Sequence, residues 1–260
     1  MKNKLIWSFI FVALISCGNA TYEPEVYIST NLTQERIDLS QEVFKKLKKE
    51  HYIKNYVKED FNINYINALI DRLDENRLYF IQSEIDNFSE ESKKYSENFF
   101  DIDLAYSVIN LYFERLITFS EYQIRLIEKQ KFDYTKDEYI DIFYEDNQWS
   151  KSKSHLEKMW RNETKNDLLI ALMSDTLSGD LNKILIKRYK NRIRRIQQQK
   201  EEDIFSIAIN TLANQFDPHS SYLSPRSVED FDMNMSLKLE GIGALLGAED
   251  DYTKIVSLVP

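Results

Sequence analysis

The sequence predicts a mainly α-helical protein, in which an N-terminal helical domain is followed by the start of a β-rich part. The 260 residues include only five glycines and four prolines, which favours long helices over a fold with many turns. Apolar residues recur at spacings of three and four as far as Phe216, whereas from Asp232 they alternate with polar residues. The sequence therefore predicts helices as far as Phe216 and strands from Asp232 onward.

Residues 1–20 are typical of a signal peptide of the lipoprotein type. Two lysines precede an apolar stretch of 11 residues, Leu5–Ile15, which is short for a membrane span. The motif Leu-Ile-Ser-Cys ends at Cys17, the only cysteine of the sequence, and we therefore expect Cys17 to be lipidated. Secretory cleavage after Ala20 is the alternative. Both readings predict an exported, periplasmic protein, which is anchored to the membrane in the first case.

The helical region consists of amphipathic patterns that follow one another after a short polar linker. Thr33 and Glu35 mark the start of the first helix. The clearest pattern runs from Asp103 to about Lys129, and Asp101 and Asp103 are better explained as its caps than as a catalytic carboxylate pair. The other expected helices are Phe61–Leu73, a short one around Ile85, Leu156–Leu177, Leu181–Gln199 and Asp203–Phe216.

The helical region ends at Asp217, because the residue before a proline is pushed out of the helical conformation. Strict alternation of apolar and polar residues over Asp232–Glu240 then predicts a half-buried strand. The features expected after it are a glycine interruption at positions 241 and 243, a turn at 250–251 and a returning strand at Tyr252–Val259.

Three motifs in this part of the chain are DPHSSYLSP (217–225), MSLKLEGIGALL (235–246) and DDYTKIVSLV (250–259). In this order they resemble the tail-specific, or carboxy-terminal processing, proteases of bacteria. Upstream segments also resemble the helical domain of that family, so the resemblance covers roughly residues 30–260. These segments are IDRLDENRLYFIQSEIDNF (70–88), Trp160–Leu177 and LIKRYKNR (185–192).

The resemblance implies a division of the chain into a helical domain (21–202), a helix and strand of the protease platform (203–236) and a truncated PDZ domain (237–260). It also implies a serine endopeptidase that recognises exported proteins through nonpolar C-termini. The catalytic serine and lysine of the family lie beyond the PDZ domain, so no catalytic residue is expected in this chain. The alternative is a non-catalytic periplasmic lipoprotein that acts as a binding or adaptor module.

The resemblance also implies a binding site for the C-terminus of a substrate. Backbone N–H groups around Gly241, Ile242 and Gly243 can point at a terminal carboxylate, and the peptide can add as a strand. Leu239, Ile242 and Leu245 are expected to shape a pocket for the last side chain. Without the resemblance, the two glycines indicate a bulge or bend in a core strand.

The charge of the chain limits its partners. A net charge of −9 argues against a general nucleic-acid binder. The expected partners are polypeptide tails, a lipoprotein adaptor and, through a lipid on Cys17, a membrane. The segment Lys183–Lys200 carries eight basic residues and no acidic one. It is either a patch that faces a membrane or steers substrates, or a solvated helix face.

No cofactor or metal is expected, because His51, His155 and His219 do not occur at the spacing of metal ligands. His219, Ser220 and Ser221 are adjacent, and adjacent residues rarely present a nucleophile and its base to each other. A polar turn is the expected structure there. Tyrosines and phenylalanines between residues 95 and 145 either line a binding groove or fill the core, and their helical spacing favours the core.

Overall fold

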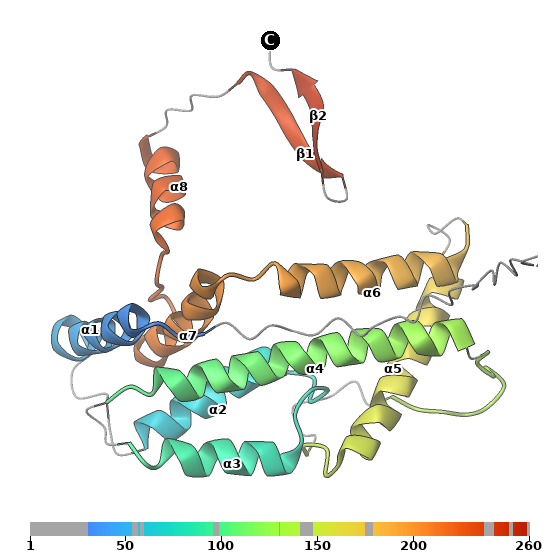
Figure 1. The fold of residues 1–260 in the computed structure, drawn as a ribbon, viewed down its shortest axis with the longest axis horizontal. Helices are drawn as coiled ribbons and strands as arrows, with labels where there is room; N and C mark the ends of the chain where they lie inside the picture. Colours follow the sequence, from blue (N-terminus) through green and yellow to red (C-terminus); the bar gives the residue numbers. More distant parts are fainter. Residues whose placement is uncertain are drawn as a thin grey trace, which may run out of the picture.

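The computed structural model describes residues 31–53, 57, 60–95, 99–129, 131–140, 148–174, 179–236, 242–249 and 252–258. Within these residues, the chain forms eight helices and one two-stranded antiparallel sheet (Figure 1). In chain order they are α1 (Gln34–Glu50), α2 (Phe61–Leu73), α3 (Gln82–Ser92), α4 (Ile102–Lys129), α5 (Lys153–Met173), α6 (Leu181–Gln197), α7 (Glu201–Phe216), α8 (Pro225–Ser236), β1 (Ala244–Glu249) and β2 (Tyr252–Leu258). The mainly helical prediction is confirmed.

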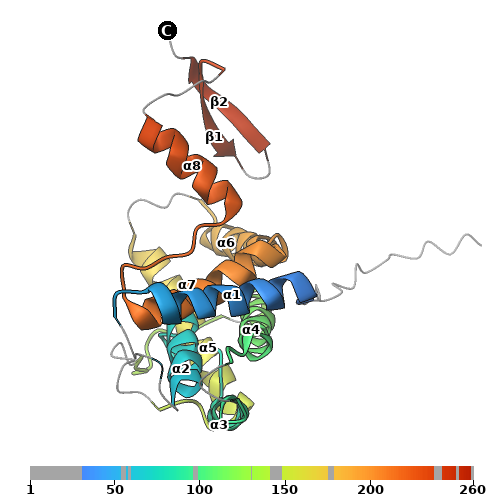
Figure 2. The ribbon, with the colours of Figure 1, turned by 90° about the vertical axis from the view of Figure 1, so that its left-hand side faces the viewer.

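Helix α4 is the centre of the helical body, and α1, α2, α3, α5, α6 and α7 all pack against it (Figures 1 and 2). Because neighbours cover several of its sides, α4 buries polar as well as apolar side chains. The buried Arg115 donates to the Tyr79 carbonyl at 3.0 Å and to Glu84 at 2.8 Å. Arg115 therefore finds its partners on other elements, whereas the buried Ser120 donates to the Leu116 carbonyl within α4 at 2.8 Å.

Helix α7 closes the body against α1, α2 and α4. Its buried side chains include all those that the sequence pattern places inward: Ile204, Phe205, Ala208, Ile209, Leu212 and Phe216. The Phe61 ring lies 5.8 Å from the Phe216 ring and 5.4 Å from the Phe44 ring. Tyr65, which is fully buried, donates its hydroxyl to the Ala208 carbonyl at 3.1 Å. Aromatic packing thus joins both ends of the helical domain in one core.

The turn between α2 and α3 is organised by Asp74, a carboxylate that is only 1% exposed. One oxygen accepts from the Leu78 N–H at 2.7 Å, and the other accepts from Tyr79 and Phe80 at 2.8 and 3.0 Å. The Leu78 carbonyl in turn accepts from the indole N–H of Trp160 on α5 at 2.6 Å. Through this turn α2, α3 and α5 are held together.

The predicted strand at Asp232–Glu240 is wrong over its first half, because α8 continues to Ser236. Pro225 stands at the first helical position, where its missing N–H costs nothing, and the Ser224 hydroxyl accepts from the Ser227 N–H at 3.2 Å. Val228, Phe231 and Met235 are spaced by three and four, so they also fit one face of a helix. The rest of the predicted strand, 237–240, lies outside the described residues.

Helix α8 and the β1–β2 hairpin rise away from the helical body (Figures 1 and 2). All 12 residues of α8 are exposed, and β2 is exposed along its whole length. Several large apolar side chains therefore face solvent in this part of the chain, among them Phe231, Met235, Leu246 and Ile255. Among the described elements, each of the two strands packs only against the other.

Candidate functional site

The expected tail-binding residues fall at the start of the hairpin. Gly243 has a φ of +68°, in the left-handed region that favours glycine, and β1 begins one residue later. Ile242 is 79% exposed and Leu245 56% exposed, so the described residues do not enclose these side chains in a pocket. Leu239, Gly241 and the expected lipidation site Cys17 lie outside the described residues.

Each strand of the hairpin has one open edge within the described residues. In a two-stranded sheet each strand has one partner, and its outer edge keeps unpaired N–H and C=O groups. Leu246 pairs with Ile255 and Leu245 pairs with Ser257, which leaves Val256 as an extra residue in a bulge. A Cβ atom on Gly247 would lie 2.8 Å from the Val256 side chain, so that side chain would have to shift if another residue replaced Gly247.

The DPHSSYLSP segment forms a polar turn against the end of α1. The Ser220 hydroxyl lies 3.3 Å from Nε2 of His51, which is 169 residues away in sequence. His51 Nδ1 accepts from the Ile53 N–H at 3.2 Å, so in the neutral ring Nε2 carries the proton and donates to Ser220. A histidine that activates a serine must instead accept the serine proton at that nitrogen. The pair is therefore structural, and a polar turn is confirmed.

Asp217 and Asp101 also have local structural roles. The His219 N–H donates to Asp217 at 2.7 Å, and this bond lowers the pKa of the Asp217 carboxyl below its ordinary value. Asp101 accepts from the Leu104 N–H at 3.1 Å, which caps α4 as the sequence predicts. Burial raises the pKa of the Asp101 carboxyl. Asp103 is exposed, and its charge adds to this increase.

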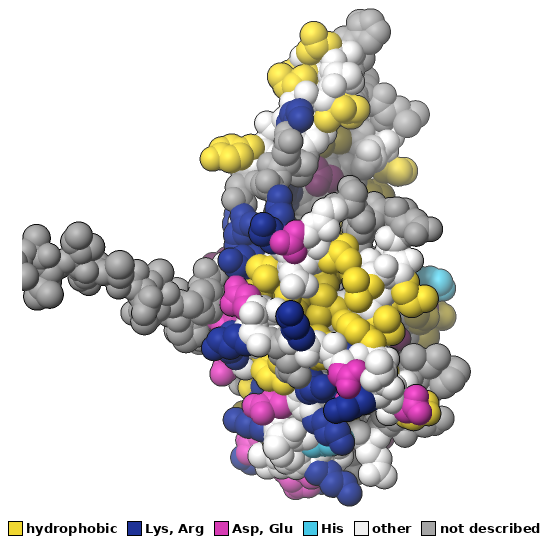
Figure 3. All heavy atoms as spheres, turned by 90° about the vertical axis from the view of Figure 1, so that its right-hand side faces the viewer, with side chains coloured by type: hydrophobic (Ala, Val, Ile, Leu, Met, Phe, Trp, Pro, Cys, Tyr) yellow, Lys and Arg dark blue, Asp and Glu magenta, His cyan; other side chains and the backbone are white. Residues whose placement is uncertain are grey.

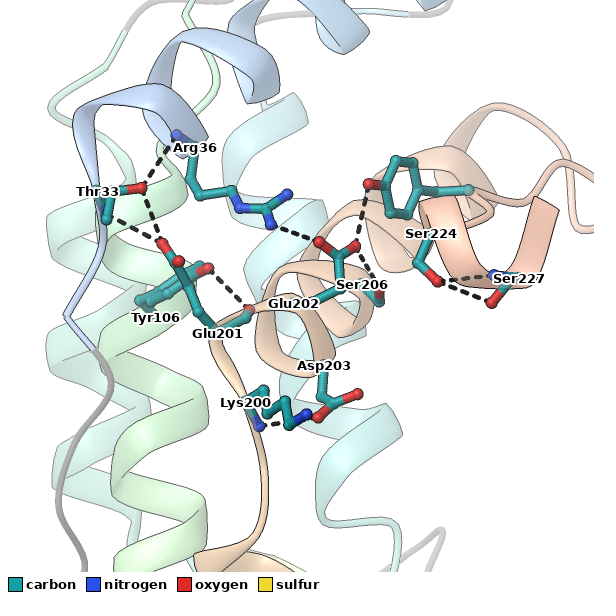
Figure 4. A network of polar contacts seen from close by, with 11 residues as sticks. Thr33, Arg36, Tyr106, Lys200, Glu201, Glu202, Asp203, Ser206, Ser224 and Ser227 are labelled. Carbon is teal, nitrogen blue, oxygen red and sulfur yellow. Dashed lines mark hydrogen bonds and ion pairs between the residues drawn. The ribbon is translucent and has the colours of Figure 1, made fainter. Parts of the chain in front are cut away.

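A network that the sequence did not reveal joins the start of α1 to the start of α7 (Figure 4). Arg36 forms an ion pair with Glu202 at 2.5 Å, and Glu201 accepts from the Thr33 hydroxyl at 2.9 Å. Glu202 also accepts from the hydroxyl of Tyr222 at 3.1 Å. Tyr222 belongs to the DPHSSYLSP motif, so the network fixes the direction in which the chain leaves the helical body toward α8.

A groove lies between the 131–140 segment and α5, with a volume of about 390 Å³. From the sequence, an aromatic groove is only the less favoured alternative. Lys165 donates to the Asp133 carbonyl at 2.7 Å and to Glu138, and its ammonium group lowers the pKa of the Glu138 carboxyl. The groove is lined by Tyr134, Tyr139, Ile140, Asn162, Asn166 and Leu169. Figure 3 shows hydrophobic side chains gathered on this end of the molecule, and Ile170, Leu172 and Met173 are exposed there.

The aromatic residues between 95 and 145 thus divide between two roles. Tyr106, Phe113 and Phe119 of α4 are buried in the core, as their spacing predicts. Tyr134 and Tyr139 instead border the groove. The sequence signal for this division is the polar stretch 131–137, which interrupts the helical spacing.

Among the residues described, no group of histidine, cysteine, aspartate and glutamate side chains could hold a metal ion. The helices in the described ranges include none that is long and apolar enough to cross a membrane.

The fold and the hairpin define a helical domain that leads through an exposed helix into a separate β unit. A family model described as the tail specific protease N-terminal domain matches residues 43–226. The tail-specific protease of Haemophilus influenzae is 31% identical over 267 residues, which covers 100% of this chain and 38% of that relative. The chain belongs to the tail-specific protease family, and it corresponds to an N-terminal portion of such a protein.

Proposed function

We propose that this chain is the N-terminal portion of an exported serine endopeptidase that degrades or processes proteins through their nonpolar C-termini. The observation that carries the proposal is the family match over residues 43–226, together with 31% identity over the whole chain. The chain spans 38% of the length of that relative. In this proposal the catalytic serine and lysine belong to a part of the protein outside these residues.

Substrate recognition would begin at the hairpin. The left-handed Gly243 turns backbone N–H groups toward a terminal carboxylate, and the unpaired edge of β1 accepts the substrate tail as a further strand. Leu239, Ile242 and Leu245 would contact the last side chain. The exposed apolar residues of β1 and β2 need a covering surface, and further residues of the longer protein would supply part of it.

The protein would work outside the cytoplasm, as a periplasmic enzyme held by a lipid on Cys17. A lipoprotein adaptor would bind the hydrophobic surface at the end of α5, where Ile170, Leu172 and Met173 are exposed. These three side chains lie beside the groove lined by Leu169 and Tyr134. An aromatic groove with an apolar rim is typical of a surface that receives a partner.

The test uses the complete gene product and an unstructured reporter that ends either in two alanines or in two aspartates. We expect rapid cleavage of the first reporter only. Gly243→Ala should raise KM for it about tenfold, since a left-handed backbone costs a non-glycine residue about 1–2 kcal/mol. The control is Gly179→Ala, which also strains a backbone with a positive φ, here +109°, but lies between α5 and α6. Equal cleavage of both reporters would refute the proposal.

A further inference from the structure

Helix α6 presents a strongly cationic face to solvent. Seven of its 17 residues are lysine or arginine, and none is aspartate or glutamate. Its buried residues are Leu185, Tyr189, Ile193 and Ile196, and with them it packs against α4 and α5. Since these four residues occupy one side of the helix, most of the basic side chains are left exposed. Arg192 is an exception, because it donates to Gln123 of α4 at 3.2 Å. Figure 3 shows lysine and arginine side chains gathered below the hairpin.

The positive charge of this face is poorly neutralised. Lys183 pairs with Asp180 at 3.5 Å, but in a highly exposed position, where an ion pair contributes little. In the part of the chain that the structure describes, Arg188, Lys190 and Arg195 form no ion pair. A shallow hollow of about 400 Å³ runs along the helix and has no acidic residue in its lining, which is Ile184, Lys187, Arg188, Asn191, Arg192 and Arg195.

The contrast with the rest of the molecule is large, because the chain as a whole carries a net charge of −9. A cationic strip on an acidic protein attracts anionic groups to one place and repels them elsewhere. The shape of the surroundings limits what such a group can be. Helix α8 and the hairpin rise on the side of the body where α6 lies (Figures 1 and 2), so a flat bilayer would meet them first. The hollow has no aromatic side chain in its lining on which a nucleotide base could stack.

We propose that the exposed face of α6 binds an acidic, extended segment of polypeptide and thereby concentrates acidic substrates beside the hairpin. The inference rests on the proposed function, since it assigns this segment to the substrate upstream of its C-terminal tail. Arg188 and Arg195 would pair with carboxylates, and the Asn191 amide would bond the peptide backbone. Ile184 gives the hollow an apolar floor for the side chains between them.

The test measures peptide binding to residues 21–260, which contain every element that the structure describes. The probe is a labelled peptide in which glutamate alternates with serine, with an amidated C-terminus, and the reference peptide has glutamine in place of glutamate. We expect the acidic peptide to bind about tenfold more tightly at low salt and to lose most of this advantage at about 0.15 M salt. Arg188→Glu with Arg195→Glu should abolish the preference.

The matched control is the double variant Lys45→Glu with Lys46→Glu on the exposed side of α1, which changes the net charge of the protein by the same amount. It should keep the preference. Equal weakening by the two double variants, or equal binding of the two peptides, would overturn the proposal. So would binding to phosphatidylglycerol vesicles without binding to the acidic peptide. The probe peptide has no free C-terminus, and the assay measures binding without proteolysis. A negative result here therefore does not affect the tail-recognition proposal. Conversely, a failure of tail-dependent cleavage does not prevent the measurement of peptide binding to α6.

Discussion

Asparagine in place of Asp74 is expected to destabilise the helical domain by about 2–3 kcal/mol near neutral pH. The two carboxylate oxygens accept three backbone N–H groups, from Leu78, Tyr79 and Phe80. Asparagine offers one oxygen, so its amide N–H₂ must face at least one of these donors. A buried donor without a partner costs about 1–3 kcal/mol, and the Asp74 side chain is in a buried position where little water can replace the bond.

Urea denaturation followed by circular dichroism measures this loss, and thermal unfolding should show a decrease in Tm of about 5–10 °C. Asp71→Asn is the matched control, because Asp71 is an exposed residue of α2 whose ion pair with Arg77 should contribute less than about 1 kcal/mol. A loss below about 0.5 kcal/mol for Asp74→Asn would refute the role assigned to this carboxylate.

The same substitution has a predicted pH dependence. Burial raises the pKa of the Asp74 carboxyl above its ordinary value of 3.8, although the three N–H bonds act in the opposite direction. The folded protein then binds this proton more tightly than the unfolded chain does. The contribution of Asp74 to stability therefore decreases as the pH rises from its pKa in the unfolded chain to its higher pKa in the folded protein. The difference in unfolding free energy between wild type and Asp74→Asn should therefore be larger near about pH 4 than near about pH 7.

Three further substitutions test other contacts. Trp160→Phe removes the donor to the Leu78 carbonyl and should cost about 1–2 kcal/mol of unfolding free energy, measured by urea denaturation. Ser220→Ala should leave the peptidase turnover of the complete gene product unchanged, and a large loss of turnover would contradict the structural role of the His51 contact. Glu202→Gln breaks the partly exposed ion pair with Arg36 and should lower the free energy of unfolding by about 1 kcal/mol. Faster amide hydrogen exchange around Tyr222 would be the measurable sign.

The helices of the helical body, α1 to α7, could be predicted from the sequence because each buries apolar residues at helical spacing. The α2 bounds were predicted to the residue, Phe61–Leu73, and all six residues predicted to be buried on α7 are buried, together with Thr211 and Ala213. Helix α4 differed more, because it is buried on several sides and its buried residues include polar ones such as Arg115. Its partner Glu84 lies 31 residues away, and no local pattern predicts such a pairing.

The errors and omissions also have physical reasons. Alternation of Met233 and Met235 with polar residues fits a strand, but Phe231 and Met235 equally fit a helix, and Pro225 with Ser224 settles the segment as α8. The Ser220 contact to His51 joins residues that are 169 positions apart, so the sequence offered only the neighbouring His219 as a partner. The network around Glu202 was missed for the same reason.

The central proposal is that this chain supplies the helical portion of a protease, with a site for substrate tails, and that the catalytic residues lie outside these 260 residues. The most direct test compares this chain with the complete gene product, on one unstructured substrate that ends in two alanines. The account predicts turnover by the complete gene product, abolished by a serine-directed inhibitor, and none by the 260-residue chain. Inhibitor-sensitive turnover by the 260-residue chain alone would contradict the account.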